Sequence, residues 1–395
     1  MIAYNSIQIC RCMMKEYNLE DIAPIEQGEC PQTDYVWLLN LDMVESNTGN
    51  IKDYEYVRIN EIGNSTVSFD SSNVLYSKLR PYLNKVVLPN KPGYATSEMV
   101  VLKPKPEVIT REYLTYFLRS SHFVNYINSR TTGAKMPRVN IKDLKQVRVP
   151  CPSLDMQNYI VKLFQTCIKI INIREKELVI LDNLVKARFV ESFGDPVQNN
   201  NKYPEHSLGD DIDFLTSGSR GWVKYYSSKG KMFITIKNVK CGHISMDNIQ
   251  YINPPDNAEA RRTKVQAGDL LISITADLGR TGVVTKEIAK KGAYINQHLM
   301  CVRLDKKILL PEFVSFFMES QAGKRQFYAK NQNAVKAGLN FDAIKTFKIM
   351  VPPLEKQNEY VSFTERVNKS KVAIDHCVIL IRKALQSGYH NVWGN

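Results

Sequence analysis

The hydrophobic pattern of this chain changes character twice, and each time a run of short segments gives way to a long helical one. Between Pro152 and Gly194 there is no glycine or proline, and apolar residues recur at alternating spacings of four and three. This spacing is typical of a helix with one apolar seam, as in a coiled coil. We therefore predict a helix over residues 155–193, about 39 residues and roughly 58 Å long at ~1.5 Å per residue.

A second helix of the same kind is predicted over residues 354–386, ending at Gly388. The predicted helix–helix seam consists of Ile160, Phe164, Cys167, Ile171, Leu178, Leu181 and Val185 in the first helix and Val367, Ile374, Val378, Ile381 and Leu385 in the second. Because a globular segment separates the two helices, we expect them to pair antiparallel. The alternative is that each helix packs only on its own domain.

Each long helix is preceded by short β-branched and aromatic runs punctuated by glycine, asparagine and proline, which predict strands and turns. The predicted strands cover residues 35–41, 65–69, 74–76 and 86–88, and then 233–236, 269–274 and 300–304. In each half one amphipathic helix follows, over about 111–128 and 311–328. A strand ending at Pro150 or Val351 then leads into the long helix.

The chain repeats itself at an offset of 200 residues. Residues 140–161 align with residues 340–361 without gaps, and identical pairs include Pro152 with Pro352 and Gln157 with Gln357. We therefore predict an α+β fold made by tandem duplication: two α/β domains separated by two long antiparallel coiled-coil helices, with pseudo-twofold symmetry. The predicted segments are a first domain (1–152), a central helix (153–194), a second domain (195–352), and a C-terminal helix with its tail (353–395).

The balance of basic and acidic residues indicates which kind of molecule the chain binds. Among 395 residues, 53 are basic and 40 acidic, which gives a formal charge of +13. Because the basic residues are spread through segments with folded patterns, they favour a shaped nucleic-acid surface over a flexible basic arm. A basic enzyme without such a partner is the alternative. No apolar run is long enough to span a membrane and the N-terminus does not resemble a signal peptide, so we expect a cytoplasmic protein with no membrane partner.

No known catalytic or metal-binding motif is present. The sequence lacks a P-loop, an H-E-x-x-H pair and a G-x-S-x-G turn, and its six histidines are dispersed. The eight cysteines form no C-x-x-C pair, and only Cys10 and Cys12 lie close together, so we expect free thiols in a reducing compartment. We predict no catalytic residue and no metal site.

Several segments resemble the target-recognition domains of type I restriction-modification specificity subunits. They are VLYSKLRPYLNKV at 74–86, YATSEMVVLKP at 94–104, TSGSRGW at 216–222, GDLLISITADLGRTGVV at 268–284 and INQHLM at 295–300, together with the P-x-L-x-x-Q helix starts at Pro152 and Pro352 and ESFGDP at 191–196. The resemblance covers nearly the whole chain apart from roughly the first 14 residues.

The resemblance implies a non-catalytic DNA-recognition subunit. Each domain would read one half of a split double-stranded DNA target, and the helices would hold the two readers apart and dock two methylation (M) subunits. Restriction (R) subunits would join the full complex, with S-adenosylmethionine, ATP and magnesium bound on the partner subunits only. Three alternatives remain: a recognition subunit of another restriction class with a nuclease-methyltransferase partner, a free-standing DNA-binding protein, and an enzyme with an unrecognised site.

The loops between matched strands differ between the halves, which predicts an asymmetric target. The main candidates for DNA contact are Lys78, Arg80, Tyr82 and Lys85 in the first loop and Thr275, Arg280 and Thr281 in the second, followed by Lys135, Arg138, Arg220, Lys237, Asn238 and Lys336. Arginine can pair with guanine edges and asparagine with adenine, whereas lysine mostly contacts phosphate. A solvated surface role is the alternative for each of them.

Overall fold

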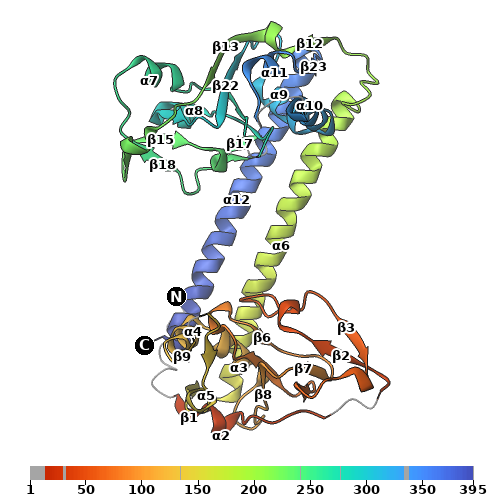
Figure 1. Cartoon of the computed structure of the whole chain (residues 1–395), viewed down its shortest axis with the longest axis vertical. Coiled ribbons are helices and arrows are strands. Elements are labelled where there is room, and N and C mark those ends of the chain that lie inside the picture. Colours follow the sequence, from red (N-terminus) through yellow and green to blue (C-terminus); the bar gives the residue numbers. More distant parts are fainter. Residues whose placement is uncertain are drawn as a thin grey trace. The chain divides into compact units, whose positions relative to one another are not determined.

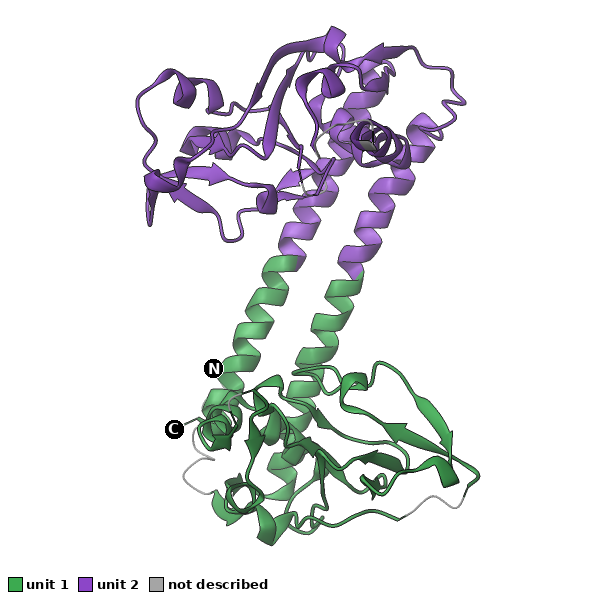
Figure 2. Cartoon of the chain, in the orientation of Figure 1, with its two compact units in different colours: residues 1–176, 375–395 green, residues 177–374 purple. Residues whose placement is uncertain are grey.

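The computed structural model describes residues 14–29, 33–133, 135–240, 242–275, 277–332 and 338–394. The chain forms two compact units: unit 1 contains residues 1–176 and 375–395, and unit 2 contains residues 177–374. Both long helices contribute to both units, as the change of colour along each helix in Figure 2 shows. The domain boundaries predicted from the sequence lie at the ends of the long helices. The two compact units instead each contain part of both helices.

Unit 1 contains two main sheets. The first has the order β3 (Glu55–Arg58), β2 (Tyr35–Leu39), β7 (Gly93–Thr96) and β4 (Thr66–Phe69), and the second has the order β6 (Val86–Val87), β5 (Val74–Ser77) and β8 (Met99–Leu102). Two further antiparallel pairs join β1 (Lys15–Asn18) to β11 (Arg148–Cys151) and β9 (Thr131–Thr132) to β10 (Arg138–Val139). All residues of β5 and β8 are buried, in accordance with their continuous apolar sequence.

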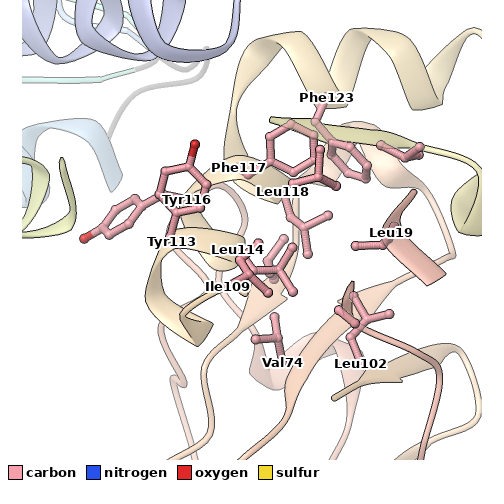
Figure 3. Close-up of a cluster of buried hydrophobic side chains, with 14 of the residues drawn as sticks. Leu19, Val74, Leu102, Ile109, Tyr113, Leu114, Tyr116, Phe117, Leu118 and Phe123 are labelled. Carbon is pink, nitrogen blue, oxygen red and sulfur yellow. The ribbon is translucent and has the colours of Figure 1, made fainter. Parts of the chain in front are cut away.

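Helices cover these strands. Unit 1 contains α2 (Leu19–Ile22), α3 (Arg111–Arg119), α4 (Ser121–Asn128) and α5 (Ile141–Lys145), with short 3-10 turns at Leu41–Met43, Ile59–Glu61 and Pro81–Leu83. Its core gathers apolar side chains from α2, α3, α4 and the central strands. Figure 3 labels Leu19, Val74, Leu102, Ile109, Tyr113, Leu114, Tyr116, Phe117, Leu118 and Phe123 in this cluster.

The prediction of one continuous helix over 111–128 is wrong. The backbone of Ser120 is extended, with φ −65° and ψ 146°, and the Ser120 hydroxyl accepts a hydrogen bond from the N–H of Phe123. Serine is a preferred N-cap because its oxygen satisfies an N–H group that the first helical turn leaves unpaired. Ser320 separates α9 from α10 in the same way, so the second predicted helix is also two helices.

Unit 2 repeats the plan with additional strands. Its sheets are β13 (Ile212–Ser217), β22 (Leu299–Leu304), β19 (Leu270–Ser273) and β20 (Thr281–Val283) in one, and β14 (Tyr226–Ser227), β18 (Gln250–Ile252), β15 (Lys231–Ile234) and β21 (Ala293–Ile295) in the other. Two short pairs join β12 (Glu205–Ser207) to β23 (Lys348–Met350) and β16 (Val239–Lys240) to β17 (His243–Ile244). The helices are α7 (Ala258–Thr263), α8 (Lys286–Lys291), α9 (Pro311–Glu319), α10 (Gln321–Gln332) and α11 (Phe341–Lys345), and 3-10 turns lie at Leu208–Asp211, Trp222–Tyr225 and Ile236–Asn238.

The duplication is visible in the strand pairing, for which Figure 1 labels β2, β3 and β7 in unit 1 and β15 and β18 in unit 2. In unit 1 a parallel pair places Leu38 opposite Tyr94, and in unit 2 a parallel pair places Phe233 opposite Tyr294. Each of these pairs is flanked by an antiparallel strand, β3 in unit 1 and β18 in unit 2. The predicted tandem duplication of an α/β domain is therefore confirmed.

The long helices are α6 (Leu154–Phe193) and α12 (Leu354–Trp393), each of 40 residues. The first agrees with the prediction, but the expected end of the second at Gly388 is wrong. A Cβ atom at Gly388 would lie 3.0 Å from Cε1 of Phe164. This glycine permits close approach of an aromatic ring and does not end the helix, which continues to bury Val392 and Trp393 in the core of unit 1.

The two helices pair antiparallel within each unit. In unit 1 the ring of Phe164 stacks on that of Tyr389 with centroids 4.7 Å apart, and further along α6 Glu175 accepts a hydrogen bond from Arg382. Residue numbers thus rise along α6 while they fall along α12. In unit 2 the Tyr360 hydroxyl donates to the carbonyl of Val185, and Lys371 forms an ion pair with Asp182.

The predicted seam positions lie on the less exposed side of each helix. Ile160, Phe164, Ile171, Val185, Val367 and Val378 are buried, and Cys167, Leu178, Leu181, Ile374, Ile381 and Leu385 are half-buried. Each helix also packs on the domains, since Ile160 and Phe164 belong to the core of unit 1 and Val185 and Val367 to the core of unit 2. Among the helices that the structure describes, none has an apolar stretch long enough to cross a membrane.

Candidate nucleic-acid interface

In unit 1 the structure brings two of the predicted basic segments together. The loop after β5 runs beside residues 137–139: the N–H of Arg80 donates to the carbonyl of Pro137 at 2.7 Å, and the N–H of Val139 donates to the carbonyl of Lys78 at 2.9 Å. Arg80 has φ 49° and ψ 61°, a left-handed conformation that costs of order 1–3 kcal/mol for a non-glycine residue. The neighbouring structure therefore fixes the backbone at this exposed arginine.

The predicted side chains of the loop after β5 and of residues 135–138 differ in exposure and in hydrogen bonding. Arg80, Tyr82 and Lys135 are exposed, and Lys78 is half-buried. Arg138 donates from Nε and Nη2 to the carboxylate of Glu98, with a shortest distance of 2.9 Å, and these hydrogen bonds raise the pKa of Arg138 above its usual value. A guanidinium held in one orientation by a carboxylate is suited to presenting its remaining N–H groups to a base edge or phosphate.

Lys85 does not belong to the exposed surface. Its Nζ donates a hydrogen bond to the carbonyl of Leu41, and desolvation lowers its pKa. The side chain therefore attaches the loop to the segment after β2. Its prediction as a DNA contact was based on charge alone, which does not show the direction of a side chain.

In unit 2 the three motif segments at 216–222, 268–284 and 295–300 meet in one hydrogen-bonded row. Arg220 Nε donates to Gln297 Oε1 at 2.9 Å, Gln297 Nε2 lies 3.3 Å from His298 Nε2, and His298 Nδ1 lies 2.7 Å from the Thr275 hydroxyl. Arg220 and Lys237 are exposed, while Arg280 is half-buried and ion-paired with Asp277. The row offers donors and acceptors at fixed positions, as base recognition requires.

Two predicted contacts of unit 2 face the interior. Thr281 is fully buried, and its hydroxyl donates to the carbonyl of Ser315, while its N–H donates to Glu319 Oε1. Asn238 is also buried, and its side chain bonds the backbone around it, accepting from the N–H of Thr235 and donating to the carbonyl of Ser245. Both side chains hold loops in place and cannot reach DNA. Lys336 lies outside the described residues.

Gln297 and His298 were missed as site residues. Their sequence signal is a polar interruption, Asn296-Gln297-His298, between strands that are otherwise buried and apolar. Relative to the strands that follow, Glu98 of unit 1 stands where His298 stands in unit 2. The two units therefore place an acid and an imidazole at equivalent positions, which is a concrete chemical difference between the two surfaces.

The described residues show no metal-binding cluster of three or more histidine, cysteine or acidic side chains. Cys151, Cys167, Cys301 and Cys377 are free thiols, and burial raises the pKa of Cys151 to about 12. A thiol with this pKa stays protonated at neutral pH and is a poor nucleophile. Cys10, Cys12, Cys30 and Cys241 lie outside the described residues.

Comparison with known proteins identifies the family. The family model of the type I restriction modification DNA specificity domain matches residues 13–181 and 226–379, which is most of the chain. The chain therefore belongs to this family, and the resemblance inferred from its motifs is confirmed.

Individual relatives share little sequence identity with it. The EcoKI specificity subunit of Escherichia coli strain K12 is 24% identical over 286 residues, which cover 68% of this chain and 60% of that protein. The MjaVIII specificity subunit of Methanocaldococcus jannaschii is 19% identical over 306 residues, covering 74% of this chain and 70% of the relative. The match to the EcoDI specificity subunit of Escherichia coli spans only 34% of that relative's length.

Solved structures share the fold. A chain from a structural study of complex assembly and conformational transition in the type I R-M system has a TM-score of 0.62 at 17% identity, with 96% of this chain and 97% of that chain covered. The S subunit of a type I restriction-modification system from M. genitalium has a TM-score of 0.60 at 13% identity, with 97% and 96% covered. The fold of this chain, two α/β domains with two long helices, is therefore shared with a solved S subunit.

Proposed function

We propose that this chain is the DNA-recognition subunit of a type I restriction-modification complex and that each unit reads one half of a bipartite double-stranded target. The observation that carries the proposal is the repeated fold with different polar chemistry at matched positions. Unit 1 presents Arg80 and a Glu98–Arg138 pair, whereas unit 2 presents Arg220, Gln297 and His298. Two readers that share a scaffold and differ in donors and acceptors recognise different half-sites, so the target is asymmetric.

The long helices are the docking surface for two methylation subunits in this proposal. Away from the seam they expose large apolar side chains, which on a helix in water mark contact with another protein. These residues are Ile170, Ile173, Val179, Ile180, Leu184 and Val190 of α6 and Val372, Ile379 and Leu380 of α12. Two of these positions recur at the 200-residue offset, Val179 with Ile379 and Ile180 with Leu380, as two copies of one partner would require.

The chain itself performs no chemistry in this proposal. S-adenosylmethionine is bound by the methylation subunits, and ATP and magnesium are bound by restriction subunits that join the full complex. The chain determines where on the DNA the methylation subunits act, because it holds them at one sequence in the duplex.

Reconstitution tests the proposal. The chain is co-expressed with the methylation subunit of its own operon, and methylated adenines in a plasmid library are read by sequencing. We expect one bipartite, asymmetric motif when both proteins are present and no methylation with either protein alone. Methylation by the isolated chain would favour an enzyme, and tight binding to one sequence without the methylation subunit would favour a free-standing DNA-binding protein.

A further inference from the structure

A row of aromatic and cationic side chains lies on one face of strands β2 and β3 in unit 1. The register places Tyr35 opposite Arg58 and Trp37 opposite Tyr56, so these four side chains share a face of the pleated pair. Tyr54, two residues before Tyr56, brings its ring within 5.1 Å of the Trp37 ring. We call this set the aromatic ribbon; its members are Tyr35, Trp37, Tyr54, Tyr56, Arg58 and Lys91.

The ribbon combines a buried anchor with an exposed outer surface. Trp37 is only 1% exposed and packs edge-on against Phe69, whereas Tyr35, Tyr54 and Tyr56 are 55%, 42% and 51% exposed. Strand β3 is the edge of its sheet (Figure 1). Tyr56 lies on this edge strand, Tyr54 just before it and Tyr35 on the neighbouring strand β2. These three half-exposed tyrosines form a surface that is apolar in its rings and hydrogen-bonding at its hydroxyls, which is typical of a binding site.

Both charges on the ribbon are positive and both are held in place. Lys91 Nζ lies 4.2 Å from the ring centroid of Tyr54 and 5.0 Å from that of Tyr56, and it donates a hydrogen bond to the Tyr56 hydroxyl. Arg58 Nε donates to the Tyr35 hydroxyl at 3.2 Å. Contacts with ring faces favour the cation and restrict its motion. The ribbon is therefore a preorganised cationic surface.

Two acidic residues of this segment, Glu55 and Glu61, are engaged elsewhere. Glu55 alternates to the opposite face of β3, where its carboxylate accepts a hydrogen bond from Asn40 Nδ2. The Glu61 carboxylate accepts from the backbone N–H of Arg58. The ribbon face thus presents hydroxyl donors and two cations, which is complementary to a polyanion.

The ribbon is joined to the loop that carries Arg80. The segment between β2 and β3 is hydrogen-bonded to that loop twice, through Lys85 Nζ with the carbonyl of Leu41 and through the N–H of Asn47 with the carbonyl of Leu83. These hydrogen bonds hold the loop and the segment that connects the two ribbon strands in fixed positions within unit 1.

We infer that the aromatic ribbon binds the phosphate backbone of duplex DNA flanking the half-site read by unit 1. Lys91 and Arg58 each neutralise one phosphate, and the tyrosine hydroxyls donate to phosphate oxygens. This inference rests on the proposed function, to which it adds a contact that carries affinity without reading bases.

Unit 2 lacks the ribbon. The matched parallel pairs make Met232 the counterpart of Trp37, and Met232 lies opposite Tyr251, the counterpart of Tyr56. By the same register Gly230 stands in place of Tyr35 and Asn253 in place of Arg58. In addition, β14 pairs with β18, so the strand that corresponds to β3 is not a sheet edge. The flanking contact therefore belongs to one half of the target.

The test compares two double variants in the assembled complex of the chain with its methylation subunits. The first is Arg58→Ala with Lys91→Ala, and the matched control is Lys105→Ala with Lys142→Ala, which removes the same charge from two exposed lysines of unit 1. Binding to a fluorescein-labelled duplex that carries the methylated motif is measured from 0.05 to 0.3 M salt. Because each phosphate contact contributes about 0.9 to the slope of log K against log salt, the ribbon variant should lose about 1.8 of slope. The control should retain the wild-type slope, and all variants should methylate the same motif.

Tyr56 variants separate the ring from the hydroxyl. Tyr56→Phe keeps the ring beside Lys91 but removes the hydroxyl donor, so it should lose part of the affinity, and Tyr56→Ala, which also removes the ring, should lose more. Thermal unfolding of each variant checks that the domain is folded. Trp37 is left unchanged in all of the variants.

Three outcomes overturn the inference. An unchanged salt slope in the Arg58/Lys91 variant would mean that the ribbon does not contact DNA, while the proposed function would stand. A folded ribbon variant that no longer joins the methylation subunits on size-exclusion chromatography would identify a protein-binding surface instead. A wild-type complex that selects no sequence would refute the proposed function itself, together with the inference.

Discussion

Gln157 and Thr110 are joined by a hydrogen bond that fixes the start of a long helix to its domain: the buried Gln157 Oε1 accepts from the N–H of Thr110 at 2.9 Å. Gln157 Nε2 donates to the carbonyls of Val108 and Pro152, both at 2.9 Å. Gln357 repeats the arrangement with the N–H of Leu310. One side chain thus satisfies three backbone groups and sets the direction of α6 and of α12 relative to the domain in which each begins.

Gln157→Ala should destabilise unit 1 by several kcal/mol, because each buried polar group left without a partner costs about 1–3 kcal/mol. Urea unfolding followed by Trp fluorescence gives the change in free energy. The neighbouring Asn158→Ala, at an exposed position of the same helix, is the control and should change stability by less than about 0.5 kcal/mol. Equal effects of the two substitutions would contradict the structural role of Gln157.

Trp393→Ala should destabilise unit 1 even though Trp393 is near the end of the chain. Its Nε1 donates to the Tyr113 hydroxyl at 2.9 Å, and its ring packs near Phe164 and Tyr389. Loss of a buried tryptophan typically costs about 3–5 kcal/mol. Hydrogen exchange should show faster exchange in α3 of unit 1 and unchanged exchange in α9 of unit 2. Uniform loss of protection in both units would mean that they do not unfold separately.

Gly388→Ala tests the close approach of α12 to α6. In an exposed helix this change adds about 1 kcal/mol of stability, but here the new Cβ would lie 3.0 Å from Phe164. We therefore expect that Gly388→Ala does not increase the free energy of unfolding. In a Phe164→Leu background, which lacks the ring edge, the same substitution should increase it. A double-mutant cycle measures this difference as a coupling energy. Additive effects of the two substitutions would show that the contact does not constrain position 388.

The sequence predicted those features that depend on periodicity or on repetition along the chain. The seam from Ile160 to Val185 was visible because a helix repeats every 3.6 residues, and the duplication was visible because Gln157 and Gln357 occupy the same place in two copies. The break at Ser120 was missed because a serine within an amphipathic run fits a helix interior as well as an N-cap. The prediction of a helix end at Gly388 is wrong because the reason for this glycine is a contact with Phe164, which is distant in the sequence.

The candidate site was less predictable, because contact depends on side-chain direction and on segments far apart in sequence. Charge indicated Arg80, Arg138 and Arg220, which line the two surfaces, but it also indicated Lys85, which points inward. The hydrogen-bonded row through Gln297 and His298 forms only when three segments meet, so the sequence of any one segment does not predict it. Burial of Thr281 and Asn238 follows from tertiary packing, which spacing alone does not encode.

The paired helices should measure the spacer between half-sites. A matched insertion of seven residues into α6 and α12 preserves the seam, whereas an insertion of four residues shifts it. We expect the heptad variant to fold and to methylate motifs with a longer spacer, and the four-residue variant to lose activity. Methylation of the original spacing by the heptad variant would mean that the helices do not set the distance.

The central claim is that two independent readers share one chain, and replacing one reader tests it most directly. Residues 15–150 are exchanged for the equivalent domain of a relative, the chimera is expressed with the methylation subunits, and methylated sites are read across a genome. Independent readers predict that one half of the bipartite motif changes while the other half keeps its bases. Arg80→Ala should relax one position in the same half, at a cost of about 1–3 kcal/mol if the contact is bidentate. A chimera that altered both halves together would contradict the account.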